Sequence, residues 1–224
     1  ARRFLEEARD AADPRLKTSL LTRAASLMWQ YGGDATVDET DAIFDEALAA
    51  DPSHMPTARQ YALSLRARGR WEDVVSVFVR AATAARTREE KASAWLQAAR
   101  VLRRSLDDPV RAADAYLKVL EFSPTDEEAL GALVEYYTEL EAWDELAEMY
   151  ESALRSRQEL QAEKGMLLQL AMVHWRFRED PDAAEPFFAR LRKIEAAHPG
   201  MLDFYRARLG DEDADGRLRT ISGD

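Results

Sequence analysis

Residues 58–82 read ARQYALSLRARGRWEDVVSVFVRAA. Two apolar stretches with helical periodicity flank Gly69-Arg70-Trp71, so this segment predicts two amphipathic helices joined by a tight turn. Residues 127–154, EEALGALVEYYTELEAWDELAEMYESAL, repeat the pattern, and Trp143 follows Trp71 by 72 residues. The chain is therefore expected to be built from a repeated helix-turn-helix unit.

Aromatic residues mark the period of this repeat. Five of them stand 34, 38, 34 and 38 residues apart, each inside a segment with helical periodicity. A fixed period in this range is typical of helical repeat arrays, in which stacked units share a continuous core. We expect each aromatic to be buried between the helices of its own unit and the next: Phe44, Phe78, Tyr116, Tyr150 and Phe188.

Caps and stops place the helices along the chain. Asp108-Pro109 and Asp180-Pro181, 72 residues apart, are expected helix starts, because Asp caps a helix and Pro suits its first position. Pro186 falls inside an expected helix, which should therefore kink or begin later. First helices are expected near 16–31, 55–68, 88–105, 126–140 and 160–178, and second helices near 37–50, 71–85, 109–122, 143–157 and 182–197.

The repeats do not account for both ends of the chain. Residues 1–15 resemble the second helix of a preceding unit, and residues 200–210 the first helix of a following or capping one. Residues 211–224, rich in Gly and Asp, are expected to form a mobile acidic tail. The array itself is assigned to residues 16–199, and the chain is expected to come from a longer array.

Both helix pairs quoted above resemble the tetratricopeptide repeat (TPR). Ala62 and Val134 occupy positions where that family packs small residues, and Phe78 with Ala81 matches its aromatic and small pair, as does Tyr150 with Ala153. The resemblance implies an all-α, right-handed α-solenoid of about five TPR-like repeats. Units three and five depart from the pattern, so a resemblance to the half-a-tetratricopeptide repeats of RNA-processing scaffolds remains open.

The family resemblance also implies a binding face. In TPR proteins the first helices line a concave groove that receives extended peptides or helices, so outward positions of those helices are candidate partner-binding residues. They are Trp29, Arg59, Arg66, Arg100, Arg103, Arg104, Glu135, Thr138, Glu139, Met172 and Arg176.

Charge is unevenly distributed along the sequence. Residues 119–154 hold eleven acids and no Lys or Arg, so the net charge of −11 lies in the fourth unit. In one interpretation Arg100, Arg103 and Arg104 pair with Glu135 and Glu139 of that unit. In the other, these arginines face the groove and hold an acidic segment or a C-terminal carboxylate, which guanidinium groups bind in a bidentate way.

The acidic fourth unit is expected to be a solvated face, with a basic partner as the alternative. A strongly acidic chain is also poorly suited to nucleic acid, which needs a clustered basic face. Only the short cluster of Arg100, Arg103 and Arg104 leaves RNA binding as an open alternative.

Residue types that commonly bind metals or act in catalysis are scattered along the sequence. His54, His174 and His198 lie far apart without metal-ligand spacing, and there is no cysteine. Gly32-Gly33 is interpreted as a helix stop, since no phosphate-loop Lys follows. We therefore expect no enzyme, no catalytic residues, no metal and no cofactor.

The sequence predicts a protein-interaction scaffold whose concave face binds a peptide, a helix or a folded partner. Two alternatives remain: a self-associating segment of a larger repeat protein, and a bacterial module that senses a peptide. No apolar run is long enough to insert into a membrane. The compartment is left open, with the cytoplasm favoured.

Overall fold

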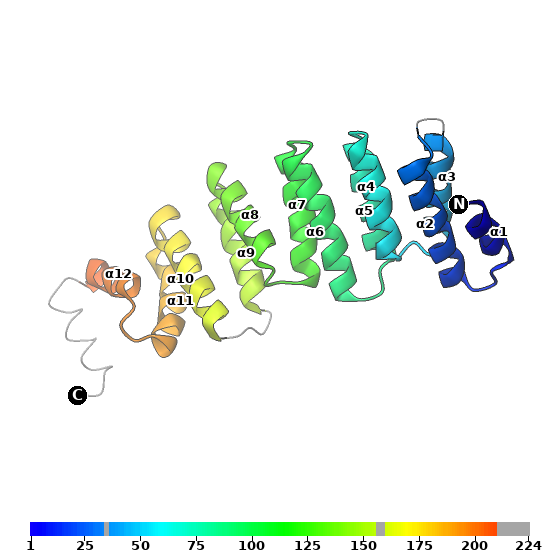
Figure 1. Cartoon of the computed structure of the whole chain (residues 1–224). Helices are drawn as coiled ribbons and strands as arrows, with labels where there is room; N and C mark the ends of the chain where they lie inside the picture. The colour runs from blue at the N-terminus through cyan, green and yellow to red at the C-terminus, as the bar shows by residue number, and fades with distance from the viewer. Residues whose placement is uncertain (34–35, 156–159, 210–224) are drawn as a thin grey trace. The chain divides into compact units, whose positions relative to one another are not determined.

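The computed structural model describes residues 1–33, 36–155 and 160–209, and this part of the chain is built from helices (Figure 1). The expected 211–224 tail lies outside the described residues. The helices are α1 (Arg2–Asp10), α2 (Pro14–Tyr31), α3 (Val37–Ala50), α4 (Met55–Ala67), α5 (Trp71–Ala84), α6 (Arg88–Arg104), α7 (Pro109–Phe122), α8 (Glu127–Glu139), α9 (Trp143–Arg155), α10 (Leu160–Met172), η2 (Val173–Phe177), α11 (Pro181–Ile194) and α12 (Pro199–Leu209).

The expected first helices are α2, α4, α6, α8 and α10, and the expected second helices are α3, α5, α7, α9 and α11. The all-α helical repeat fold predicted from the sequence is confirmed. The assignment of α1 and α12 to flanking repeats stays a prediction.

Helix α11 contradicts one of the two alternatives expected for Pro186, a later start of the helix. It begins at Pro181, one residue before the predicted start, and Pro186 lies inside it. The side chain of Asp180 accepts a hydrogen bond from the Ala183 backbone N–H at 2.9 Å, which fixes the start of the helix ahead of the second proline. The cap therefore determines where α11 begins, and Pro186 does not delay it.

The turns repeat every 72 residues in conformation as well as in sequence. Gly69 has a φ of +70°, and Glu141, 72 residues later, has a φ of +54°. Asp107 and Glu179 form a second such pair, at +50° and +53°. Gly adopts this left-handed region without strain, whereas the other three residues carry a Cβ that disfavours it.

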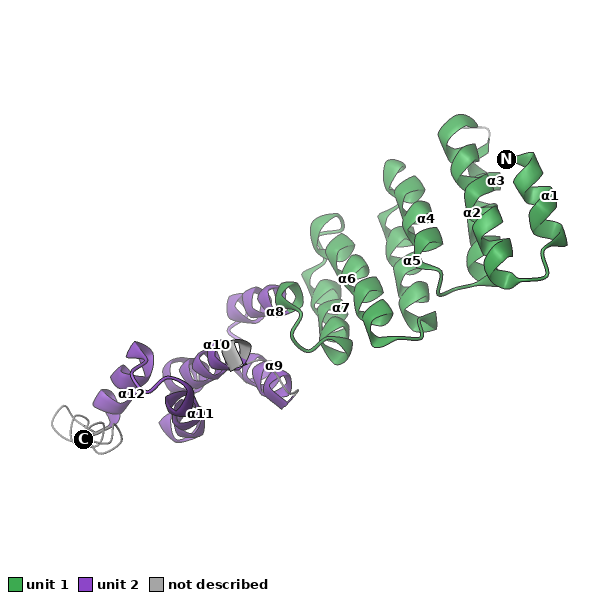
Figure 2. Cartoon of the chain, turned by 60° about the horizontal axis from the view of Figure 1, so that its bottom comes forward, with its two compact units in different colours: residues 1–129 green, residues 130–224 purple. Residues whose placement is uncertain are grey.

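The chain forms two compact units, residues 1–129 and 130–224, with the boundary inside α8 (Figure 2). In unit one, α2 packs against α3, α4 against α5, and α6 against both α5 and α7. Phe44 of α3 is fully buried and stacks on Tyr61 of α4, with ring centroids 4.9 Å apart. The aromatic of one repeat thus packs on the first helix of the next, as expected.

The five spaced aromatics are all buried, between 0% and 7% exposed. In unit two, Phe188 of α11 stacks on Phe204 of α12 at 4.4 Å, and Leu167 and Leu191 join the same core. Each such side chain contributes a large apolar area, so the aromatic period is also the period of the core.

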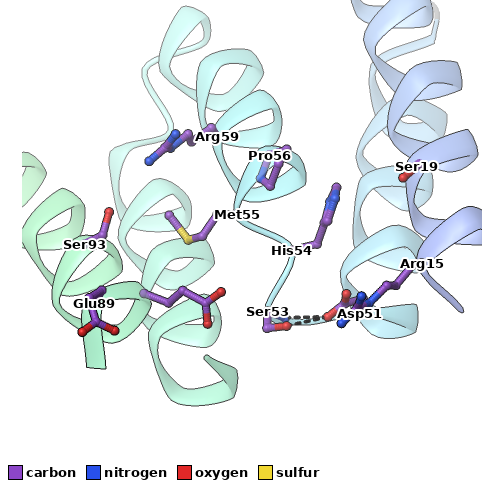
Figure 3. Close-up of a pocket in the computed structure, with 11 residues that line it drawn as sticks. Arg15, Ser19, Asp51, Ser53, His54, Met55, Pro56, Arg59, Glu89 and Ser93 are labelled. Carbon is purple, nitrogen blue, oxygen red and sulfur yellow. Dashed lines mark hydrogen bonds between the residues drawn. The ribbon is translucent and has the colours of Figure 1, made fainter. Parts of the chain in front are cut away.

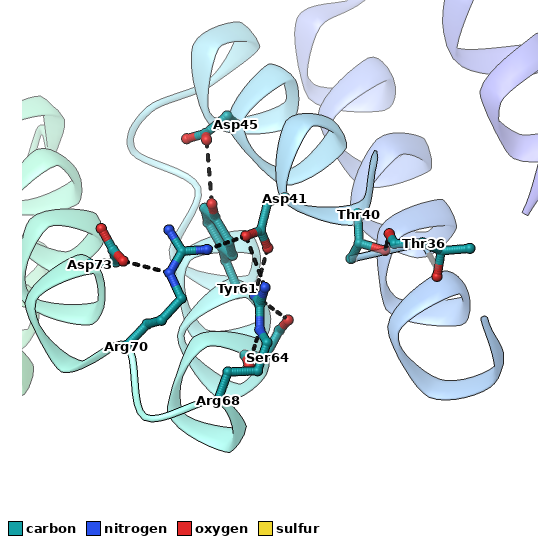
Figure 4. Close-up of polar contacts among 9 residues, drawn as sticks. All are labelled: Thr36, Thr40, Asp41, Asp45, Tyr61, Ser64, Arg68, Arg70 and Asp73. Atoms are coloured by element: carbon teal, nitrogen blue, oxygen red, sulfur yellow. Dashed lines mark hydrogen bonds and ion pairs between the residues drawn. The ribbon is translucent and has the colours of Figure 1, made fainter. Parts of the chain in front are cut away.

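Ion pairs join the first two repeats of unit one. Arg68 donates two hydrogen bonds to the Asp41 carboxylate, at 3.0 and 2.6 Å, and Arg70 donates a third (Figure 4). Tyr61 donates to Asp45 at 3.3 Å, and burial together with Asp45 raises the pKa of its hydroxyl. These contacts fix the turn after α4 to helix α3, and so position α4 in the array.

Candidate functional site

First helices α2, α4 and α6 border two hollows in unit one. The first, which we call the Arg104 hollow, measures about 410 Å³. Its lining includes Arg66 of α4, Trp71 at the start of α5, and Gln97, Arg100 and Arg104 of α6. Three of the predicted site residues thus line one hollow.

Arg100 is the paired cation of this hollow. Its Nε donates to Glu128 at 2.8 Å, and a second guanidinium nitrogen donates to the other carboxylate oxygen. This bidentate bond, ahead of other causes, lowers the pKa of Glu128. Because Arg100 and Glu128 are about one third exposed, the pair is worth only about 0–1 kcal/mol.

One interpretation of the sequence pairs Arg100, Arg103 and Arg104 with carboxylates further along α8. The structure gives Arg100 the carboxylate of Glu128, which stands in the first turn of α8, and brings Arg104 to 4.0 Å from the same group. The spacing of residues in the sequence predicts that two helices are neighbours, but it does not determine which turn of one helix lies opposite which turn of the other. The pairing of these arginines with Glu135 and Glu139 stays a prediction.

Arg66 and Arg104 supply the remaining donors. Within the described part of the chain, the buried Nε of Arg66 has no hydrogen-bond partner. The Arg104 side chain is 73% exposed, and its contact with Glu128 is long. Guanidinium groups bind carboxylates in a planar, bidentate geometry, so the exposed guanidinium of Arg104 can bind an anionic group beside the positive charge of Arg66.

The second hollow, which we call the His54 hollow, measures about 660 Å³ and reaches from α2 across α4 to α6 (Figure 3). Its charged lining is mixed: two guanidinium groups face three carboxylates. The residues that matter here are Arg15, Asp51, His54, Arg59, Glu89 and Glu90.

A chain of hydroxyl groups fixes the tautomer of His54. Thr22 donates its only hydroxyl proton to the Thr18 carbonyl at 2.7 Å, so Thr57, 2.6 Å from Thr22, must donate to Thr22. Thr57 then has no proton left for His54 Nδ1, which lies 2.7 Å away. Nδ1 must therefore carry a proton and donate to Thr57, in a residue that lines the hollow.

The other predicted site residues are spread over both units. Trp29 is half-buried on α2, and Arg103 is exposed on α6. In unit two, Glu135, Thr138 and Glu139 are exposed on α8, Met172 packs against the α10–α11 core, and Arg176 lies over the Trp175 ring at 3.6 Å.

Sequence reasoning missed the His54 hollow, apart from Arg59. A lone histidine carries no sign in the sequence of the Thr18, Thr22 and Thr57 chain behind it. Glu89 and Glu90 were available as first-turn acids of α6. Their position opposite α4 depends on how the repeats stack.

Within the described ranges, no group of three or more His, Asp and Glu side chains could hold a metal ion. No helix in those ranges is both long and apolar enough to cross a membrane.

Comparisons with solved structures identify the fold. One chain of a structure of Naa15/Naa10 bound to HypK-THB matches with a TM-score of 0.52 and 18% identity, over 88% of this chain and 30% of that one. YrrB, a TPR protein with an unusual peptide-binding site, matches at 0.42 and 15%, over 89% and 94%. PilF of Pseudomonas aeruginosa matches at 0.41 and 15%, over 84% and 80%.

Comparisons with protein-family models and with curated proteins found no match. The fold is that of a TPR-like helical repeat protein, with two hollows along the first helices of its first unit.

Proposed function

We propose that the chain is a protein-interaction scaffold that binds an extended peptide segment along the first helices of unit one and performs no chemistry. The observation that carries the proposal is that residues predicted from the sequence to face outward on the first helices line hollows in the structure. Arg59, Arg66, Arg100 and Arg104 were selected from the sequence as outward positions of first helices, and all four line hollows.

The Arg104 hollow supports an acidic ligand group. Arg66 and Arg104 have donors that the described residues leave unsatisfied, whereas Arg100 is already neutralised by Glu128. A ligand carboxylate would gain charge-assisted hydrogen bonds from the exposed Arg104 guanidinium, whose contact with Glu128 is long, and would lie near the charge of Arg66. We therefore assign an acidic side chain or a C-terminal carboxylate of the partner to this hollow.

Display selection of random peptides on the whole chain, followed by calorimetry, tests the proposal. We expect selected peptides to carry an acidic residue, and the double variant R66E/R104E to bind them at least tenfold more weakly, because charge reversal replaces attraction by repulsion. R9E is the matched control: Arg9 is exposed on α1 and lines neither hollow. Equal losses in both variants, or no selected peptide, would contradict the proposal.

A further inference from the structure

One face of α4 reaches from the His54 hollow to the Arg104 hollow. On α4, Arg59, Leu63 and Arg66 follow one another at steps of four and three residues, which places them on one face of the helix. Arg59 lines the His54 hollow and Arg66 the Arg104 hollow. Leu63, 46% exposed, stands between them. This face of α4 therefore runs from one hollow to the other.

Helix α6 forms the opposite wall. Glu89, Ser93, Gln97, Arg100 and Arg104 again follow at steps of three or four residues, the first two in the His54 hollow and the last three in the Arg104 hollow. At about 1.5 Å per residue, Glu89 and Arg104 are about 22 Å apart along the helix. We call the surface between these faces of α4 and α6, with a hollow at each end, the α4–α6 valley.

Charge differs between the ends of this valley. The residues that line the Arg104 end include three guanidinium groups and no carboxylate; Glu128, which pairs with Arg100, lies outside this lining. At the His54 end, Arg15 and Arg59 are outnumbered by three carboxylates, a net charge of −1 with His54 neutral.

The two ends also differ in hydrogen bonding. In its neutral form His54 has Nε2 as an acceptor, because the hydroxyl chain requires the proton on Nδ1. No interaction of the Glu89 side chain occurs among the described residues. The acceptors of the His54 end suit a group that donates hydrogen bonds, and the donors of the Arg104 end suit a carboxylate.

We propose that the α4–α6 valley selects a bipolar peptide segment of about seven residues, with its acidic residue at the Arg104 end and its cationic residue at Glu89. An extended chain covers about 3.3 Å per residue, so about seven residues span the valley. Leu63 provides an apolar contact for the middle of the segment. This inference rests on the proposed function and adds the ligand's charge pattern and its register.

The test uses capped seven-residue peptides titrated into the whole chain and followed by NMR. The bipolar peptide is Lys-Ser-Ala-Leu-Ala-Ser-Glu, and its comparison peptides carry Glu, Lys or Gln at both ends. The bipolar peptide should bind about fivefold more tightly than each of the others, because only it complements both ends of the valley. An equally tight di-Glu peptide would overturn the inference.

A nitroxide label at either end of the bipolar peptide tests the register. The label at the acidic end should broaden amide signals of residues 100–104, and the label at the cationic end those of residues 89–93. A reversed or uniform pattern would also overturn the inference. If none of the four peptides bound at millimolar concentration, the proposed function itself would be contradicted.

Charge reversal at one end completes the test. Glu89→Lys should lower the affinity for the bipolar peptide about fivefold and raise that for the di-Glu peptide. Glu39→Lys is the matched control, since Glu39 is also an exposed glutamate in the first turn of a helix. An equal change in affinity for the bipolar peptide in both variants would show that the His54 end does not bind the cationic residue of the peptide, and would overturn the inference.

Discussion

His174 is a buried histidine whose surroundings favour its neutral form. Its Nδ1 accepts a hydrogen bond from Arg178 at 2.9 Å, and its ring stacks on Phe187 at 5.4 Å. Burial, followed by the charge of Arg178, lowers the pKa of the imidazole, while Glu151, 3.9 Å from Nε2, opposes the shift. The folded state therefore resists protonation of this residue.

This resistance makes stability depend on pH. The unfolded chain takes up a proton on His174 near pH 6.5 and the folded chain at a lower pH, so the unfolded state binds more protons in between. The contribution of His174 to stability is thus full above about pH 6.5 and is lost as the pH falls below it.

The variant His174→Phe should flatten the dependence of unfolding free energy on pH between 7.5 and 5.5, because it removes this titration and keeps the ring stacked on Phe187. Urea unfolding monitored by Trp fluorescence measures the slope. His198→Gln, at a partly exposed histidine, serves as the control. An unchanged slope in His174→Phe would contradict the assignment.

At the scale of elements, the inter-helix turns carry strain that the sequence could relieve. Glu141 holds a φ of +54° at the place where the equivalent turn has Gly69. The left-handed region costs a residue with a Cβ about 1–2 kcal/mol, part of which Gly returns through its greater freedom when unfolded.

Glu141→Gly should therefore stabilise the folded chain by about 0.5–1 kcal/mol. The reverse change, Gly69→Ala, should destabilise it by about 1 kcal/mol through the backbone alone, since a Cβ at Gly69 would meet nothing within 4 Å. Urea titration of both variants measures the two effects. Destabilisation by Glu141→Gly would show that the turn depends on the glutamate side chain.

Helix positions were predictable because local rules govern them. Asp108 caps α7 through a bond from the Arg111 N–H at 3.0 Å, and Gly32 ends α2 through a bond to the Met28 carbonyl at 2.7 Å. The π-helical turn Val173–Phe177 was not predictable, since apolar periodicity continues through it. Its wider hydrogen-bond pattern includes the Arg178 backbone N–H, which donates to the Val173 carbonyl five residues earlier at 3.0 Å.

At the scale of the molecule, the sequence predicted the class of fold, and four of its candidate site residues line the two hollows. The buried aromatic period is a property of each repeat and can be counted along the chain. The partner of Arg100 and the His54 hollow depend on which turns of successive repeats lie level. This alignment of turns is determined by packing between repeats, and the spacing of residues in the sequence does not reveal it.

The central claim is that a partner segment binds along the first helices of unit one. Amide hydrogen exchange of the whole chain, with and without a selected peptide, tests it most directly. Protection concentrated in residues 55–67 and 88–104, which form α4 and α6, is the predicted result. Protection concentrated in the second helices α5 and α7, or confined to unit two, would contradict the account.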